Sequence, residues 1–226
     1  MVLTVGDIIK QVRWCIDEEK ANISGLVGVD ENDDAYMDNI IKAKVHDALR
    51  WCLQYAPSDM LTSDGSTLTP GQKMVVTTEI PIMREMNPTT ITLPANALRF
   101  IRVRLPKWKK AVRVPIEEDS DKYVELSDET ATATEDRPVA ALIRTDPLQL
   151  ELWPGGEVGD DVEISYVVSP LPVSVDSISE VSEVYIPDKL RNAYLYYIAF
   201  LLMSAYGDSR ASVMLSIAKM NLGLTE

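Results

Sequence analysis

The residue types that most often carry out chemistry are scarce in this chain of 226 residues, and its one histidine is His46. Asp47 stands beside it, and Cys52 follows six residues after the histidine. In a segment with helical periodicity, that spacing puts His46 and Cys52 on different faces. A catalytic triad would therefore need a partner from elsewhere in the chain. We interpret His46 as an ordinary surface or interface histidine and expect no catalytic residues.

A second candidate for chemistry is the acidic run at residues 30–34. Asp30, Asn32 and Asp34 occupy the first three ligand positions of a calcium-binding loop. Ala35 stands where such a loop has its sharp-turn glycine, and Ile41 replaces the final bidentate glutamate. The run therefore favours a solvated, helix-capping loop. We expect neither a metal site nor a cofactor.

The strongest charge feature is a basic segment at residues 99–113, which an acidic run at 117–136 follows. The basic segment contains Trp108 and seven cations: Arg99, Arg102, Arg104, Lys107, Lys109, Lys110 and Arg113. One interpretation is a nucleic-acid patch with an aromatic platform. The alternatives are a contact with the acidic run of a neighbouring copy, or ion pairs within one chain. The chain has 22 Lys and Arg against 35 Asp and Glu, and this net charge of −13 repels phosphate. We therefore favour pairing between copies or within the chain.

The elements that position these residues follow from hydrophobic periodicity. Apolar residues at helical spacing predict helices over about 4–19, 34–55 and 186–222, and Thr4 with Asp7 forms the first helix start. The middle third alternates apolar and polar residues instead, as half-buried strands do. It predicts strands over 74–80, 89–93, 100–105, 112–116, 139–144, 148–153 and 162–168, and a surface excursion over 119–136.

The last helical region is apolar on all sides, since no charged residue stands between Arg191 and Asp208. A helix of this kind must be covered all round. We therefore expect one side to lie at an interface between copies of the chain, through Tyr196, Phe200 and Met203. The same interface is expected to include Arg99, Arg102, Arg104, Lys107, Trp108, Lys109 and Lys110.

The predicted fold class is α+β, with a helical layer made from both ends of the chain and a small antiparallel β-domain inserted between them. The expected bounds are 1–70 for the N-terminal helices, 71–175 for the β-domain and 176–226 for the C-terminal helices. The two cysteines, Cys15 and Cys52, fall in separate predicted helices, which favours buried thiols over a disulfide or a metal site. No stretch has the apolar length of a membrane span.

Several short phrases, in this order, resemble the tail adaptors of short-tailed bacteriophages, which are head–tail connector proteins. They are the helix start at residues 4–9, Leu-Pro-Ala-Asn-Ala-Leu-Arg-Phe-Ile-Arg-Val at 93–103, and Leu-Gln-Leu-Glu-Leu-Trp-Pro at 148–154. Val-Glu-Ile-Ser-Tyr at 162–166, Ile-Pro-Asp at 186–188 and Gly-Asp-Ser-Arg-Ala at 207–211 complete the set. The resemblance covers nearly the whole chain.

The resemblance implies a structural virion protein without catalytic residues. It implies a homo-oligomeric ring, a dodecamer, that joins the portal protein to the tail or nozzle proteins at the neck, after assembly in the host cytoplasm. Genome DNA would pass through its lumen during ejection without sequence-specific binding. The alternatives are a virion binding module, whose β-domain attaches tail fibres or a glycan, and a virion-associated hydrolase.

Overall fold

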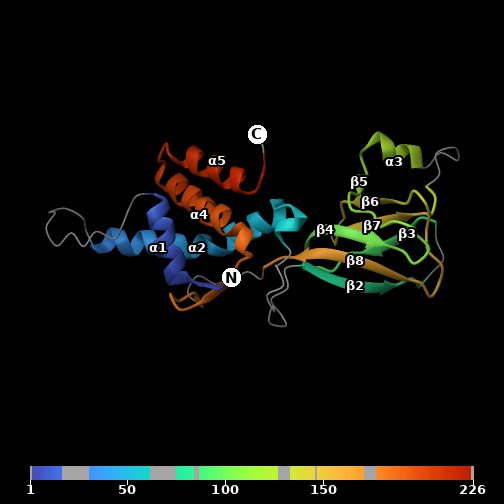
Figure 1. Ribbon diagram of the computed structural model, residues 1–226, viewed down its shortest axis with the longest axis horizontal. Coiled ribbons are helices and arrows are strands. Elements are labelled where there is room, and N and C mark those ends of the chain that lie inside the picture. Colours follow the sequence, from blue (N-terminus) through green and yellow to red (C-terminus); the bar gives the residue numbers. More distant parts are fainter. Residues whose placement is uncertain are drawn as a thin grey trace. The chain divides into compact units, whose positions relative to one another are not determined.

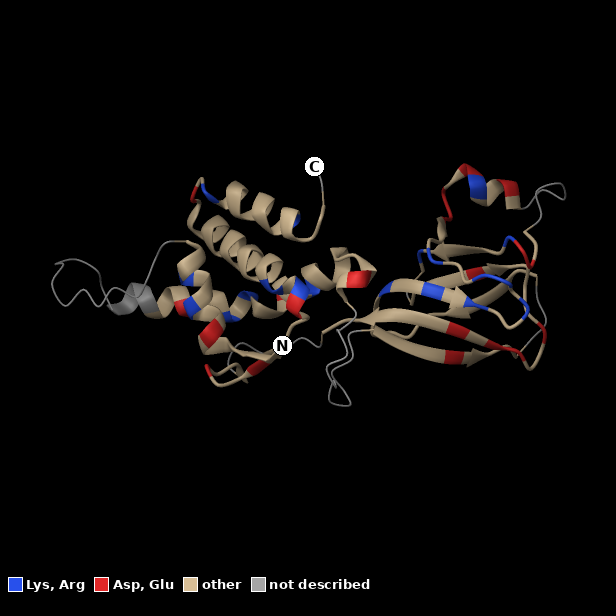
Figure 2. Ribbon diagram, in the orientation of Figure 1, with Lys and Arg blue, Asp and Glu red and all other residues tan. Residues whose placement is uncertain are grey.

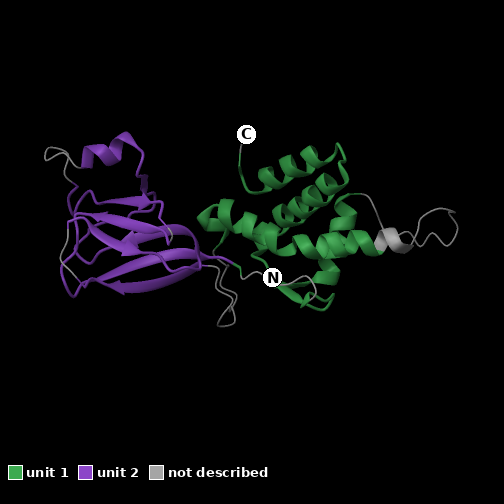
Figure 3. Ribbon diagram, turned by 180° about the vertical axis from the view of Figure 1, so that it is seen from behind, with its two compact units in different colours: residues 1–72, 170–226 green, residues 73–169 purple. Residues whose placement is uncertain are grey.

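The structure is a computed structural model, which describes residues 2–16, 31–61, 75–83, 87–126, 133–145, 147–170 and 177–224; the side chains of residues 31–34 are also outside the description. The fold is α+β, as predicted. Two compact units make up the chain: unit 1 consists of residues 1–72 and 170–226, and unit 2 of residues 73–169 (Figure 3). Each unit is described by itself below.

Unit 1 is helical, with a short two-stranded sheet (Figure 1). Its helices are α1 (Val5–Cys15), α2 (Glu31–Tyr55), α4 (Arg191–Tyr206) and α5 (Ala211–Asn221), with 3-10 turns η1 (Ser58–Met60) and η3 (Asp188–Leu190). Strands β1 (Val2–Thr4) and β9 (Glu183–Tyr185) pair antiparallel, so that Val2 lies opposite Tyr185. This pairing brings the segment before α1 beside the segment before α4.

The start of α1 is fixed by the cap that the sequence predicts. The Thr4 hydroxyl oxygen accepts a hydrogen bond from the Asp7 backbone N–H at 3.1 Å. The same hydroxyl donates to the Asp7 carboxylate at 2.7 Å. These bonds satisfy one of the unpaired amides at the helix start and hold a negative charge at the positive end of the helix dipole.

Helix α4 runs through the middle of unit 1. It packs against α5 and also against α1 and α2, and it contains the charge-free stretch of the sequence (Figure 1). Its Tyr194 is fully buried and donates a hydrogen bond from its hydroxyl to the backbone carbonyl of Val45 on α2 at 3.2 Å. Gly207 ends the helix in the left-handed conformation, at φ 69°, which a glycine adopts without a steric cost.

Unit 2 consists of two sheets. One has the order β2–β8–β4, formed by β2 (Val75–Pro81), β8 (Asp161–Val168) and β4 (Ala97–Arg104). The other has the order β3–β7–β6–β5, formed by β3 (Thr89–Thr92), β7 (Gln149–Trp153), β6 (Val139–Ile143) and β5 (Ile116–Glu117). All pairs are antiparallel except β5–β6.

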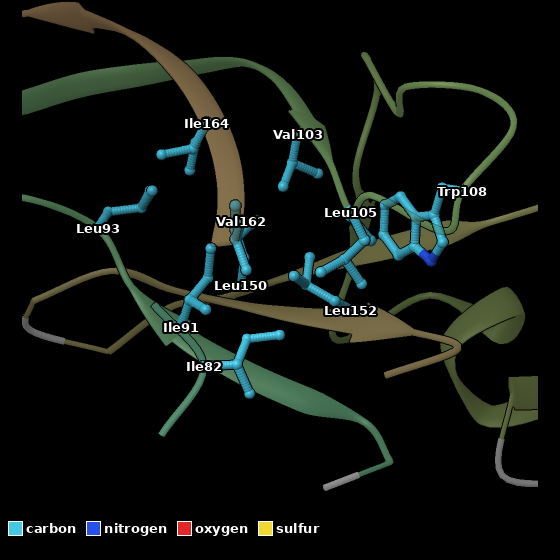
Figure 4. Packing of buried hydrophobic residues seen from close by; sticks show 11 residues of the cluster. Ile82, Ile91, Leu93, Val103, Leu105, Trp108, Leu150, Leu152, Val162 and Ile164 are labelled. Atoms are coloured by element: carbon cyan, nitrogen blue, oxygen red, sulfur yellow. The ribbon is translucent and has the colours of Figure 1, made fainter. Parts of the chain in front are cut away.

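The two sheets of unit 2 share one apolar core. Val103 on β4 and Ile164 on β8 come from the first sheet, while Ile91 on β3 and Leu150 on β7 come from the second, and all are buried together (Figure 4). The period-2 pattern of each strand therefore places its apolar side chains on the inner face.

The structure differs from two expectations for the middle of the chain. The predicted strand at 112–116 is reduced to a single bridge between Val112 and Val103, followed by the two residues of β5. The predicted surface excursion at 119–136 contains a short helix, α3 (Asp121–Leu126). The Ser120 hydroxyl oxygen accepts from the backbone N–H of Tyr123 at 3.3 Å, which is the bond of a helix cap.

Candidate assembly interface

Ion pairs within unit 2 account for two members of the basic segment. Arg102 on β4 donates from Nη2 to the Glu163 carboxylate at 2.6 Å and from Nε to the Ser165 hydroxyl at 3.2 Å. Ser165 in turn shares a 2.8 Å hydrogen bond with Thr77 on β2. These bonds form a polar ladder across the three strands of the first sheet, so the Arg102 side chain is held within its own chain.

Lys109 is paired in a similar way with the end of the acidic run. Its Nζ lies 2.6 Å from a carboxylate oxygen of Asp136, and both side chains are mostly exposed. The hydrogen bond between them raises the pKa of Lys109 and lowers the pKa of Asp136. A further pair, Arg144 with Glu117 at 2.9 Å, joins β5 to the end of β6. Part of the acidic run is therefore neutralised by its own chain.

Trp108 lies inside unit 2 and not on its surface. Its side chain is 1% exposed, beside Leu105 and Leu152, and its indole N–H donates to the backbone carbonyl of Pro154 at 3.1 Å (Figure 4). A side chain buried in this way cannot serve as an aromatic platform for a base or as a contact for a neighbouring copy. We therefore remove Trp108 from the set of interface residues.

The remaining cations of the basic segment differ in exposure. Arg99 is half-buried, and this burial lowers the pKa of its guanidinium. Arg104 and Lys110 are exposed and Lys107 is half-exposed. These three cations, together with exposed Arg113, are the part of the basic segment that unit 2 offers to a partner.

Helix α4 is covered on more sides within one copy than its sequence leads us to expect. Because α5 covers it in addition to α1 and α2, one copy of the chain buries side chains on both sides of the helix. Met203 is only 3% exposed, so it joins Trp108 among the residues that are not available to a partner. Tyr196 and Phe200 are half-buried and remain at the surface of unit 1. The need for a neighbouring copy to cover α4 is thus much reduced.

A row of aromatic rings crosses from α2 to α4 on the surface of unit 1. The rings of Trp51 and Tyr197 stack with centroids 3.9 Å apart and planes at 4°. Tyr55 extends the row at 5.6 Å from Trp51, and Phe200 extends it at 5.4 Å from Tyr197. Tyr55 is 48% exposed and the other three are half-buried. Large, partly exposed aromatic side chains are typical anchors of protein–protein interfaces.

Sequence reasoning found only Phe200 of this row. It gave Trp51, Tyr55 and Tyr197 no role at an interface. The available signal was spacing, since Trp51 and Tyr55 are four residues apart on one helix and Tyr197 and Phe200 are three apart on another. Only the packing of α2 against α4 makes them a single row.

The described side chains of unit 1 that could take part in catalysis do not form a catalytic arrangement. His46 is half-buried, burial lowers its pKa, and its Nδ1 has no hydrogen-bond partner among the described residues. Cys52 is fully buried, which raises the pKa of its thiol. Cys15 is half-buried, and burial raises its pKa as well. Burial therefore favours the protonated thiol of both cysteines over the thiolate, which is the nucleophilic form.

Unit 1 also contains a cavity of about 430 Å³ between α1, α2 and the segment before β9. A buried ion pair between Arg13 and Asp38, at 2.7 Å, forms part of its lining, and the mostly exposed Trp14 lies at its edge. The described residues that line it include no histidine, cysteine or serine. We therefore assign the cavity no chemical step.

The acidic run at residues 30–34 lies mostly outside the description, which leaves out Asp30 and the side chains of residues 31–34. Asn32 and Asp34 fall within the first turns of α2. Across the described parts of the chain, no group of three or more His, Cys, Asp and Glu side chains is arranged to hold a metal ion. In those same parts, no helix has both the length and the apolar character needed to cross a membrane.

Comparison with known proteins gives one result that covers both units. The family model described as SU10 adaptor protein matches residues 3–226. No curated protein sequence matches the chain. The matched range includes α2 and α4 with their aromatic row, and also the basic segment of unit 2.

Proposed function

The chain belongs to the SU10 adaptor protein family and is a structural head–tail adaptor of a phage particle, and we propose that it works as a ring between the portal and the tail. The ring holds twelve copies, with the portal protein on one side and tail or nozzle proteins on the other. The observation that carries this proposal is the family match, which extends over both units. In this proposal the protein assembles in the host cytoplasm and then forms part of the neck of the virion.

The ring proposal is supported by surfaces that one copy leaves open. The aromatic row of α2 and α4 presents apolar area at the surface of unit 1, and unit 2 presents unpaired charge. Two different surfaces that bind each other head to tail generate a closed ring when the rotation between copies completes a circle. We assign the aromatic row to one of these contacts.

Genome DNA passes through the centre of the proposed ring without sequence-specific binding. A charge of −13 on each copy, repeated around a channel, repels phosphate and lets the duplex slide. The cations of unit 2 that are paired with Glu163 and Asp136 add little attraction for the duplex. We propose no catalytic role, no cofactor and no membrane contact.

Mass photometry of the purified full chain, alone and mixed with portal protein, tests the ring. Twelve copies of 25.2 kDa give 12 × 25.2, about 302 kDa, as the expected added mass. Negative-stain images of the same sample should show rings. A protein that stays at 25.2 kDa with portal present, and that binds glycans or tail fibres, would replace the adaptor ring with the binding-module alternative.

Two matched variants on α2 test the aromatic row. Tyr55→Glu puts a charge at the end of the row and is expected to weaken ring formation at least about tenfold, because an interface buries an unpaired carboxylate poorly. Tyr36→Glu is the control, since Tyr36 is 60% exposed and its ring contacts Tyr206, outside the row. Equal ring formation by both variants would remove the row from the contact and leave the ring itself in place.

A further inference from the structure

Two groups stand out among the charged side chains of unit 2 that form no internal ion pair: one is basic, and the other is acidic except for the exposed Lys122 (Figure 2). The basic group consists of Arg104, Lys107, Lys110 and Arg113; the acidic group consists of Glu118, Asp119, Asp121 and Glu125. Within the described parts of the chain, none of these eight side chains forms an ion pair. All are exposed except Lys107 and Glu118, which are half-exposed.

Each charged group has an exposed apolar side chain close to it in the sequence. Val114 follows the basic group and is 81% exposed, and Val124 on α3 lies among the acidic residues and is 68% exposed. An apolar residue with charges around it is the usual composition of an interface, where the apolar part is buried and the charges form the rim. The two surfaces are thus complementary in charge and alike in apolar content.

The two groups come from different parts of unit 2. The basic group begins at the end of β4, an edge strand of the three-stranded sheet, and continues along the segment that follows it. The acidic group lies on α3 and the turn before it, after β5, which is an edge strand of the four-stranded sheet (Figure 2). Surfaces from different elements allow contacts of the head-to-tail kind, in which one patch of a copy meets another patch of its neighbour.

We propose that the basic group of one copy binds the acidic group of the next copy, so that unit 2 fixes the register between neighbouring subunits. The inference rests on the proposed ring and names the partner of this surface as a second copy of the chain. Val114 of one copy and Val124 of the next lie at the centre of the contact. The charged side chains around them select the partner surface by attraction to opposite charge and repulsion of like charge.

Charge complementarity favours a second copy over nucleic acid as the occupant of the basic group. In the proposed contact, four cations of one copy meet four carboxylates of the next copy. These carboxylates have no ion-pair partner on the described part of their own chain. Phosphate, in contrast, would have to approach a chain with a net charge of −13. The buried position of Trp108 also removes the stacking platform that a single strand would use.

Charge reversal in the full chain tests the contact. The first variant combines Lys110→Glu with Arg113→Glu, and the second combines Asp119→Lys with Glu125→Lys. Each alone is expected to weaken ring formation at least about tenfold in mass photometry, because like charges then face each other. The ring of the unmodified chain is expected to weaken as salt rises from about 0.1 M to about 0.5 M.

Restoration by complementary charges is the sharper readout. An equimolar mixture of the two variants is expected to form rings of alternating copies, since each surface then meets one of opposite charge. A single chain that carries all four substitutions is expected to form rings with itself. Restoration also shows that the variants are folded, because a misfolded chain would not assemble with a partner.

A control variant, Glu79→Lys with Glu183→Lys, makes the same change in net charge as the second variant. Glu79 is exposed on β2, the edge strand opposite β4, and Glu183 is exposed on β9 of unit 1. This control is expected to form rings as the unmodified chain does.

Three results would overturn the contact: rings from both reversal variants at unmodified strength, no restoration in the mixture and in the four-substitution chain, or loss of DNA binding with ring formation unchanged. The last result would assign the basic group to nucleic acid. Failure of the unmodified chain to form rings with portal is a different outcome, since it removes the proposed function itself.

Discussion

Replacement of Trp108 with alanine separates a core role for this residue from a role between subunits. Its side chain is 1% exposed and packs in the core of unit 2 with Leu105 and Leu152, so the truncation leaves a cavity. Removal of a buried tryptophan costs about 3–5 kcal/mol. The change also leaves the Pro154 carbonyl without the indole N–H that it accepts, at about 1 kcal/mol within that range.

Hydrogen exchange of the full chain, followed by mass spectrometry, measures this loss within unit 2. Each loss of about 1.4 kcal/mol raises the equilibrium constant for opening tenfold. Exchange of the protected amides of β4, β7 and β8 should therefore accelerate by roughly 100-fold to 4,000-fold. Peptides from α1 and α4 in unit 1 provide the internal reference. Trp108→Phe keeps an aromatic ring in the core and is expected to give a smaller acceleration, because it loses chiefly the hydrogen bond to Pro154.

Trp14→Ala is the matched control. It makes the same substitution at the surface of α1, where Trp14 is 61% exposed. Its cost should stay within about 0.5 kcal/mol, or less than about threefold in exchange rate. If Trp108→Ala leaves exchange in unit 2 unchanged and abolishes ring formation, the assignment of Trp108 to the core is wrong.

Three further predictions concern unit 1. Arg13→Ala should lower the free energy of unfolding in urea by about 3–5 kcal/mol, because it removes the guanidinium that pairs with the buried Asp38 carboxylate at 2.7 Å; a loss under about 1 kcal/mol would contradict this. Gly207→Ala should cost about 1–2 kcal/mol in the same assay because alanine is strained at φ 69°, and a neutral result would mean that the turn after α4 relaxes. Burial raises the pKa of Cys52 and of Cys15, so at pH 8 both thiols should react with iodoacetamide more slowly than in urea, with Cys52 the slower; rapid native labelling of Cys52 would show that unit 1 opens there.

Local signals in the sequence were sufficient for most elements of the fold. The bonds between Thr4 and Asp7 lie where the cap pattern places them, and α2 ends at Tyr55, just before Pro57. The turn at Thr145 and Pro147 separates β6 from β7, and the Thr145 hydroxyl donates to the Pro147 carbonyl at 2.8 Å. Caps, turns and periodicity act over a few residues, so a single sequence contains them.

Which of the expected interface residues are exposed could not be obtained in the same way. Trp108 stands among four Lys and Arg residues between positions 104 and 110, and only the packing of two sheets shows that it is buried. The uncharged stretch of α4 signals that the helix is covered, but it does not say whether α5 or a neighbouring copy covers it. Both questions depend on contacts between residues far apart in sequence.

The short helix α3 was missed because its composition resembles a loop. Four of the seven residues from Asp119 to Glu125 are Asp, Lys or Glu. Only Leu126 of this helix is buried. Helices of this length gain little from propensity and depend on their capping bonds and on their attachment to the rest of the fold. Here the Ser120 bonds supply the cap, and Tyr123 donates to Glu151 on β7 at 2.8 Å.

The first and last strands of unit 2 are neighbours, and Val75 of β2 lies opposite Val167 of β8. The chain therefore enters and leaves this unit at adjoining positions. A unit inserted in this way can be replaced by another or deleted, because only a short linker is then needed to join the two parts of unit 1. Such an exchange leaves the sequence of the helices of unit 1 unchanged, because both ends of the inserted segment lie side by side.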